Sequence, residues 1–302
     1  MTLAESAAGD LPGLGDVLKG FAEIQRELKI DCNFSLPGAW ELGRQHIKKD
    51  SPVSWNYSGT LGVVNSVPGG GVDPGKLVSG LAKAAERLGA AVFENSRVQN
   101  ISYQEPLQLE VAGDRIRAGQ VLIATNAESL ELSDLSGGAE PKFTLAVATE
   151  ALTEAQFENL GLSSRHSFYT VDMPYLWGRP LRQSQLIFGS GLVHLNHWSE
   201  LQNLNISSGE AGGLMRLLET RVRALHPVLE NVGFTNRWGG PILIADEMKP
   251  VFRRHLKSDS IIILGGYSGH GVAQSVYLGR WAAEVLAGRR KLPTWNKAGA
   301  KH

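Results

Sequence analysis

The protein has 302 residues, of which 42% are apolar and 20% charged, and its 30 Lys and Arg residues balance 30 Asp and Glu residues. This balance argues against nucleic acid or an anionic membrane as a partner, and the length allows two domains with buried cores. A single cysteine, Cys32, excludes an internal disulfide framework. We find neither a signal-peptide pattern nor an apolar run of the ~18 residues that a membrane helix needs, so we expect a cytoplasmic protein.

The first half of the chain mixes helices with short strands. Apolar residues recur with helical spacing over residues 13–30, and a second helix is predicted from Asp73, which can cap it, to Gly89, which ends it. Strands are predicted at residues 39–42, 60–64, 90–94, 98–103 and 107–111. The all-apolar run 121–124 predicts a buried parallel strand.

The second half changes character and then returns to alternating strand and helix. Long loops join the predicted strands 145–151, 167–171, 175–177 and 185–189, without the interleaved helices of a parallel sheet. A helix is predicted at 210–225, followed by strands at 234–238 and 242–245. The chain closes with a strand at 261–264, a glycine-rich turn and a helix that ends near Gly288. The pattern predicts an α/β layer from both ends of the chain that encloses a mostly antiparallel region.

Two motifs are weaker than they look. The run from Gly70 to Leu77 almost matches a phosphate-binding loop, but Asp73 would bring negative charge, Pro74 lacks an amide donor and Leu77 cannot bind magnesium. His194 and His197 lack the glutamate of a zinc helix, and one cysteine with scattered histidines predicts no metal site. We therefore expect neither a nucleotide triphosphatase nor a metalloenzyme.

The segment 261–288 is the strongest functional signal. An apolar strand leads to Gly265 and Gly266, and Gly269 and Gly271 permit positive φ and close approach of a ligand to the backbone. The helix that starts near Gly271 presents unpaired amides and the positive end of its dipole. The glycines run in the reverse order of a dinucleotide fingerprint, and no second strand with an acidic residue follows. The pattern predicts a cofactor-binding turn rather than a complete nucleotide-binding unit.

The chain resembles the D-amino-acid oxidase-like family of FAD-dependent oxidoreductases in four regions. The last turn, 265–272, is the most specific, and its GYSGHGV run is similar to that of the putrescine-oxidase-like branch. The others are the run 68–77 with its helix, the run 121–127 after Val98, and Arg237-Trp238-Gly239-Gly240 followed by residues 248–250. Ala273, which follows Val272, stands where sarcosine oxidases carry a lysine.

The resemblance implies a fold, a cofactor and a set of residues. The fold implied is an incomplete glutathione-reductase-like FAD-binding α/β domain (residues 1–30, 68–133 and 248–302) with an inserted, mostly antiparallel substrate domain (residues 31–67 and 134–247). The implied cofactor is non-covalent FAD, held by Val98, Ala124, Thr125, Asn126, Gly239, Gly240, Gly266, Tyr267, Ser268, Gly269, His270, Gly271 and Val272. The expected substrate-facing or catalytic residues are Tyr267, His270 and Arg179, with Tyr169 and Trp177 on the opposing sheet.

The implied reaction is hydride transfer from the carbon beside an amine to the flavin, followed by hydrolysis of the imine. The helix N-terminus after the turn suits the negative charge of a reduced flavin. We expect a small amine or amino acid as substrate. The family's N-terminal strand and G-x-G-x-x-G loop have no counterpart in the sequence, so we expect a truncated or split enzyme. The alternative is a non-catalytic remnant, or a subunit that binds flavin only with a partner chain that supplies the missing unit.

Overall fold

The computed structural model describes residues 2–4, 17–133, 135, 138–195, 200 and 204–295. It divides into two compact units. Unit 1 comprises Met1–Ala7, Asn33–Pro74 and Lys142–Pro241, and unit 2 comprises Ala8–Cys32, Gly75–Pro141 and Ile242–His302.

Unit 1 is built on the eight-stranded sheet β14-β10-β13-β12-β11-β2-β4-β3. Its strands are β2 (Ala39–Gly43), β3 (Trp55–Asn56), β4 (Thr60–Val67), β10 (Ala139–Thr149), β11 (Ser167–Thr170), β12 (Trp177–Pro180), β13 (Leu186–His194) and β14 (Phe234–Ala245). Strands β11 and β2 run parallel, whereas β2/β4, β3/β4, β10/β13, β11/β12 and β12/β13 are antiparallel. The predicted antiparallel region is therefore confirmed. Strands β10 and β14 each continue from one unit into the other.

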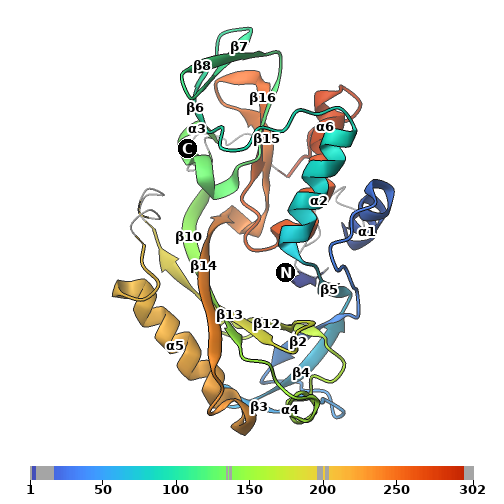
Figure 1. Cartoon of the computed structure of the whole chain (residues 1–302), viewed down its shortest axis with the longest axis vertical. Coiled ribbons are helices and arrows are strands. Elements are labelled where there is room, and N and C mark those ends of the chain that lie inside the picture. Colours follow the sequence, from blue (N-terminus) through green and yellow to red (C-terminus); the bar gives the residue numbers. More distant parts are fainter. Residues whose placement is uncertain are drawn as a thin grey trace. The chain divides into compact units, whose positions relative to one another are not determined.

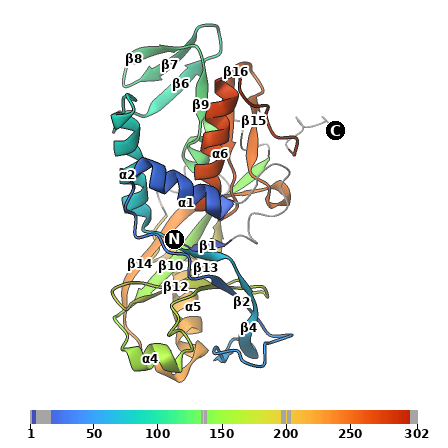
Figure 2. The ribbon, with the colours of Figure 1, turned by 90° about the vertical axis from the view of Figure 1, so that its right-hand side faces the viewer.

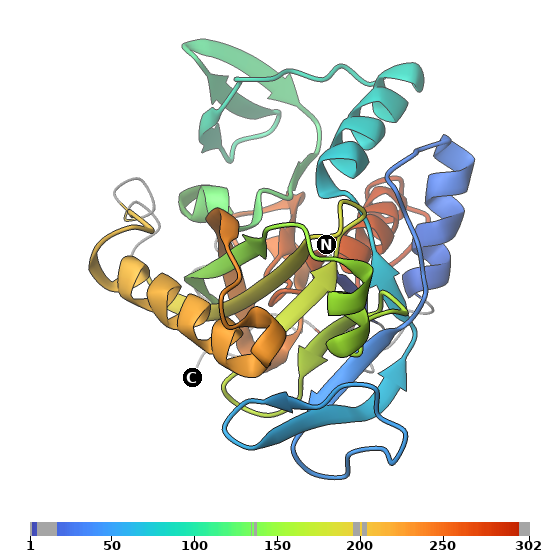
Figure 3. The same ribbon diagram turned by 60° about the horizontal axis from the view of Figure 1, so that its bottom comes forward.

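One face of this sheet forms the core of unit 1. Leu42, Phe168 and Phe188 are fully buried there, because alternate residues of a strand point to the same face. Helix α5 (Gly209–Leu225) covers this face with Met215 and Leu218, and it contacts β13 (Figures 1 and 3). The short helix α4 (Glu154–Asn159) and the 3₁₀ turn η5 (Pro227–Leu229) complete the layer.

The opposite face of the sheet carries a short ribbon. Strand β1 (Thr2–Ala4) pairs with β5 (Gly69–Gly71), and Ser167 Oγ donates a hydrogen bond to the Gly70 carbonyl. A Cβ atom at residue 70 would lie 1.9 Å from the Ser35 carbonyl oxygen. Close packing of two backbones thus explains this glycine, in agreement with the prediction that it does not belong to a phosphate loop.

The described residues of unit 2 form two three-stranded sheets and three longer helices. The sheets have the orders β15-β16-β9 and β6-β7-β8. The elements are α1 (Val17–Leu28), α2 (Pro74–Arg87), β6 (Val98–Ser102), β7 (Leu107–Val111), β8 (Asp114–Ala118), β9 (Val121–Ile123), η2 (Asn126–Ser129), α3 (Leu130–Ser133), η6 (Asp246–Met248), β15 (Val251–His255), β16 (Ser258–Gly265) and α6 (Gly271–Leu286). Helix α1 packs on α6 (Figure 2), where a Cβ at Gly20 would lie 2.9 Å from the Tyr277 ring.

Most predicted elements are present, with instructive exceptions. The strand predicted at 90–94 is wrong, and the one predicted at 175–177 lies at Trp177–Pro180 instead. The two strands predicted at 234–238 and 242–245 are one strand, β14. Sequence patterns missed α4, β8 and β15. Residues 13–16 of the first predicted helix lie outside the described residues. No helix in the described part of the chain combines the length and apolarity needed to cross a membrane.

Candidate functional site

Two predicted cofactor segments meet at the carboxyl ends of two parallel strands in unit 2. Strands β9 and β16 pair in parallel, with Val121 opposite Ile261 and Ile123 opposite Ile263. Asn126 therefore follows one strand where Gly266 follows the other. The Gly266 amide donates to Asn126 Oδ1 at 2.9 Å. The parallel pairing predicted for residues 121–124 is confirmed, and it joins segments that are 140 residues apart.

The glycine-rich turn is held in a left-handed course. Gly266, Ser268 and Gly269 have φ of 67°, 51° and 93°. Ser268 is buried; its amide donates to the Leu243 carbonyl and its Oγ accepts from the Ala245 amide, both at 3.0 Å. Hydrogen bonds to the end of β14 thus fix a backbone course that a non-glycine residue adopts only at a cost.

The start of α6 leaves polar groups without partners. His270 occupies the N-cap position, but its side chain makes no capping hydrogen bond, and the first turn holds no acidic residue. The amides of this turn and the helix dipole therefore favour a group with negative charge. Gln274, on the buried face of α6, has a side-chain oxygen with no hydrogen-bond partner. The first turn of α6 thus also carries a buried acceptor that the protein itself leaves unpaired.

Burial also decides the protonation of the two predicted side chains in the turn. Burial raises the pKa of the Tyr267 hydroxyl, so this phenol stays a hydrogen-bond donor. Burial lowers the pKa of His270, so its imidazole is neutral near pH 7. The Tyr267 ring packs on Gly271, where a Cβ atom would lie 3.3 Å from it.

The residues predicted on the adenosine side also lie in unit 2. Val98 begins β6, pairs with Val111 and packs at the edge of a small apolar cluster that includes Ile101 and Leu107. Ala124 and Thr125 are exposed and connect β9 to Asn126. Ala124 and Thr125 therefore lie at the surface of unit 2.

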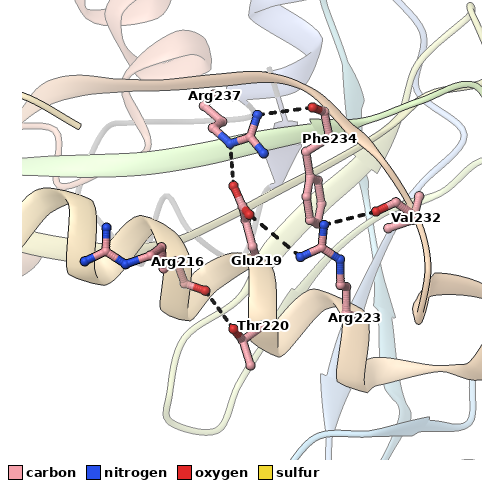
Figure 4. Close-up of polar contacts among 7 residues, drawn as sticks. All are labelled: Arg216, Glu219, Thr220, Arg223, Val232, Phe234 and Arg237. Atoms are coloured by element: carbon pink, nitrogen blue, oxygen red, sulfur yellow. Dashed lines mark hydrogen bonds and ion pairs between the residues drawn. The ribbon is translucent and has the colours of Figure 1, made fainter. Parts of the chain in front are cut away.

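The segment Arg237–Gly240 belongs to unit 1, and packing accounts for part of it. A Cβ at Gly239 would lie 2.0 Å from the Phe143 ring, so this glycine makes room for a core side chain. Arg237 donates to Glu219 of α5 and to the Phe234 carbonyl, as Figure 4 shows. These contacts fasten β14 to α5. Gly240 has open space around its missing Cβ and keeps its place as a predicted cofactor residue.

The predicted residues of the substrate side lie on the face of the unit 1 sheet that is opposite to its core. Tyr169 and Trp177 are cross-strand partners. Arg179 Nη1 donates to the Val72 carbonyl at 3.1 Å. Burial lowers the pKa of this guanidinium, and the charge of Asp73 opposes that effect only in part. The Arg179 side chain therefore binds the segment that leads into α2, besides lying on this face of the sheet.

Two polar residues escaped the sequence analysis. Glu41 accepts a hydrogen bond from Tyr169, and Gln274 lies on the buried stripe of α6 with Leu278 and Trp281. Strand alternation could have indicated the first, because Trp40 and Leu42 flank Glu41. A polar residue within an apolar helical stripe could have indicated the second.

Histidine and carboxylate side chains do not gather into a metal site in the described residues. His194 Nδ1 lies 2.6 Å from Lys142 Nζ, its neighbour across β10 and β13. His197 lies outside the described residues. The contact of His194 is thus with a cation rather than with other metal-binding groups.

Comparison with known proteins identifies the family. The family model described as FAD dependent oxidoreductase (DAO) matches residues 15–285. The chain belongs to this family. Its cofactor is FAD, and the open turn, the uncapped helix and the orphaned Gln274 oxygen lie in the segment that resembled the family most.

Similar proteins agree in class. The chain is 29% identical over 226 residues to gamma-glutamylputrescine oxidoreductase of Escherichia coli, covering 73% of this chain and 49% of the relative. It is 28% identical to the probable oxidoreductase OrdL of Haemophilus influenzae, covering 88% of this chain and 57% of that protein. The chain thus spans about half the length of these relatives.

Solved structures share the fold. L-proline dehydrogenase from P. horikoshii superposes with a TM-score of 0.70 at 16% identity, covering 93% of this chain and 79% of that one. Glycine oxidase from Geobacillus kaustophilus gives 0.67 at 18% identity, covering 95% and 85%. At these identities the likeness extends to the fold, which confirms the predicted mixed α/β class.

Proposed function

We propose that this chain binds FAD at the Gly265–Val272 turn and serves in the oxidation of an amine or amino acid. The observation that carries the proposal is the meeting of Asn126 with Gly266 beside the uncapped start of α6. The names of the relatives, gamma-glutamylputrescine oxidoreductase and glycine oxidase, support the substrate class.

The residues of the turn have distinct tasks in this proposal. The amides of Gly271 and Val272, with the helix dipole, stabilise negative charge on the bound cofactor. Asn126 holds the turn in place. Burial lowers the pKa of His270, so its ring is neutral near pH 7 and offers one hydrogen-bond donor and one acceptor to a bound substrate.

The other predicted residues border the site. Within unit 2, Ala124, Thr125 and Val98 would face the adenosine part of the cofactor in this proposal. FAD, when bound, supplies the acceptor for the hydride that leaves the carbon beside the amine. The chain's own residues orient the substrate and tune charge, and the imine product hydrolyses in water.

A second candidate concerns how the cofactor is retained. In the described sheet order β15-β16-β9, the parallel strand β9 lies at an edge. Parallel strands are normally enclosed on both sides by further βα units. The segment after α2 in the same unit also exposes Leu88 and Phe93. These features favour a partner segment or partner chain that pairs with β9 and completes the nucleotide site.

Flavin uptake tests both candidates. The purified chain is mixed with FAD, freed of unbound cofactor by gel filtration, and examined for a visible flavin spectrum. Amines are then added without oxygen, and bleaching of the flavin band reports hydride transfer. Uptake followed by bleaching is expected for an enzyme that is active alone. Uptake only in the presence of the upstream part of a relative supports the partner candidate, and no uptake in either case contradicts the proposal.

Matched variants locate the site. Gly271→Asp places negative charge at the start of α6, which repels an anionic group. FAD uptake should therefore fall more than in Gly271→Ala, which adds the same Cβ 3.3 Å from the Tyr267 ring without the charge. Gly279→Asp makes the same change later in α6, where a Cβ meets nothing within 4 Å. Retained uptake in Gly271→Asp, or equal loss in both variants, would place the flavin elsewhere.

A further inference from the structure

The segment after helix α2 in unit 2 carries a strand pattern without forming a strand. Its apolar run, Ala90-Ala91-Val92-Phe93, predicts a strand, and the structure forms none there. The helix ends in a turn at Gly89, which has a φ of 92°. Among the described residues, the amides of Ala91, Val92 and Phe93 have no hydrogen-bond partner, and neither do the carbonyl groups of Ala91 and Val92. This stretch of backbone is therefore free to pair.

The same stretch is apolar and open to solvent. All residues from 86 to 97 are exposed, and the exposed fractions of Leu88, Val92 and Phe93 are 77%, 42% and 74%. A single exposed apolar side chain is ordinary on a protein surface. Three of them beside backbone groups that lack partners form a surface onto which another strand can pair. The partner that fits this surface contributes a strand.

The charges at the two ends of the run indicate which strand fits. Arg87 precedes the run and Glu94 follows it, and neither forms an ion pair within the described part of the chain. Antiparallel pairing of two copies places the start of one run beside the end of the other, so Arg87 of each copy lies near Glu94 of the other, and Leu88 near Phe93. Parallel pairing in register would bring like charges together, which is unfavourable. The run is thus complementary to itself in the antiparallel direction.

We propose that residues 90–93 pair antiparallel with the same residues of a second copy, and that the chain forms a symmetric dimer through this edge. Each copy then uses the same surface, so the contact closes at two copies and does not continue into a fibre. The paired segment is short, and the dimer is therefore weak and depends on protein concentration. The inference does not depend on flavin binding.

Sedimentation velocity of the full chain tests the dimer. We expect the fraction of dimer to rise as the concentration increases from about 1 µM to about 100 µM. Phe93→Ser should raise the Kd of the dimer at least about tenfold, because it removes a large apolar side chain from each copy's contact. Leu256→Ser is the matched control, because Leu256 is also 74% exposed but lies in the turn between β15 and β16. It should leave the Kd unchanged.

Exchange of the charges tests the antiparallel direction. Arg87→Glu and Glu94→Arg should each weaken the dimer, because each brings like charges together. The double variant should recover it, and so should an equal mixture of the two single variants, in which opposite charges meet again. Arg87 also donates a hydrogen bond to the Leu28 carbonyl, so circular dichroism of each variant confirms that the chain is folded.

Hydrogen exchange locates the contact. In peptides that cover residues 88–97, exchange should slow as the protein concentration rises, because the amides of Ala91, Val92 and Phe93 gain partners. A chain that stays monomeric up to about 100 µM overturns the inference. Equal weakening by Phe93→Ser and Leu256→Ser overturns it as well. A different partner that covers this segment in place of a second copy would make the exchange independent of concentration, and that result also contradicts the dimer.

Discussion

At the scale of single residues, half-buried histidines tie this protein's stability to pH. Burial lowers the pKa of His270 at the start of α6. Burial also lowers the pKa of His166, whose ring stacks on Trp40 with the centroids 4.5 Å apart. Both imidazoles are kept neutral by the fold, whereas the unfolded chain protonates them near pH 6.5. Acid should therefore favour unfolding.

The contribution of His270 can be isolated. Its folded pKa lies below the unfolded one, so its stabilising effect is complete above about pH 6.5 and is lost as the pH falls below that value. In His270→Gln the decrease in urea midpoint between about pH 7.5 and about pH 5.5 should be smaller than in the wild type, with a remaining slope from His166. Urea unfolding followed by circular dichroism measures both.

The control is the exposed His46, which has a φ of 58°. His46→Asn suits that backbone and should keep the wild-type dependence on pH. If His270→Gln and the wild type lose stability in parallel, the imidazole is not shielded as the fold implies.

At the scale of elements, local sequence signals predicted a helix or strand correctly where tertiary packing favoured the same structure. They gave the wrong element or the wrong boundary where packing favoured another. Asp73, Pro74 and Gly89 predicted α2 because capping chemistry is local. The strands predicted at 234–238 and 242–245 are one strand, β14, and it runs through Gly239, where a Cβ would lie 2.0 Å from the Phe143 ring. Residues 90–93 are apolar, yet they form no strand, and Phe93 is 74% exposed.

The same contrast applies to the candidate site. The turn at Gly265–Gly271 was recognisable because glycines gather where a strand meets a helix. The orphaned oxygen of Gln274 and the hydrogen bonds that Glu41 accepts from Tyr169 and Asn65 depend on neighbours distant in sequence. Pattern and spacing identify the elements of a site, whereas the charge balance of each group needs the fold.

Helix α4 shows a local signal that was present and missed. Thr153 and Gln156 form a capping box, in which Thr153 Oγ1 accepts from the Gln156 amide and Gln156 Oε1 accepts from the Thr153 amide at 2.8 Å. Thr153→Ala should lower the free energy of unfolding by about 1 kcal/mol, and Thr153→Ser should retain most of it. Urea unfolding of the three proteins measures the difference.

A threonine inside a helix provides the opposite expectation. Thr220 of α5 donates to the Arg216 carbonyl one turn earlier (Figure 4) and is exposed. Thr220→Ala should be neutral or slightly stabilising, because alanine favours helix and the side-chain bond competes with the backbone. Equal destabilisation by both substitutions would argue against a special role for the cap.

At the scale of the whole molecule, two strands connect the stability of the two units. In β10, Lys142–Ala148 pair with β13 in unit 1, whereas Ala139 belongs to unit 2 and lies 3.7 Å from where a Cβ at Gly266 would be. In β14, the residues before Pro241 belong to unit 1, whereas Leu243 and Ala245 bind Ser268 in unit 2. Loss of the sheet in unit 1 should therefore release backbone that supports the glycine turn.

Leu186→Ala tests this coupling, because Leu186 is fully buried in β13 and its truncation should cost about 2–5 kcal/mol. Hydrogen exchange measured on peptides from both units should accelerate in β16 and α6 as well as in β11 and β13, and unfolding should remain a single transition. Leu192→Ala, in the same strand but at a residue that is 44% exposed, should change neither. A strand shared by both units should expose its continuation in one unit when it loses its pairing in the other. Faster exchange confined to unit 1 would therefore show that β10 and β14 do not transmit stability.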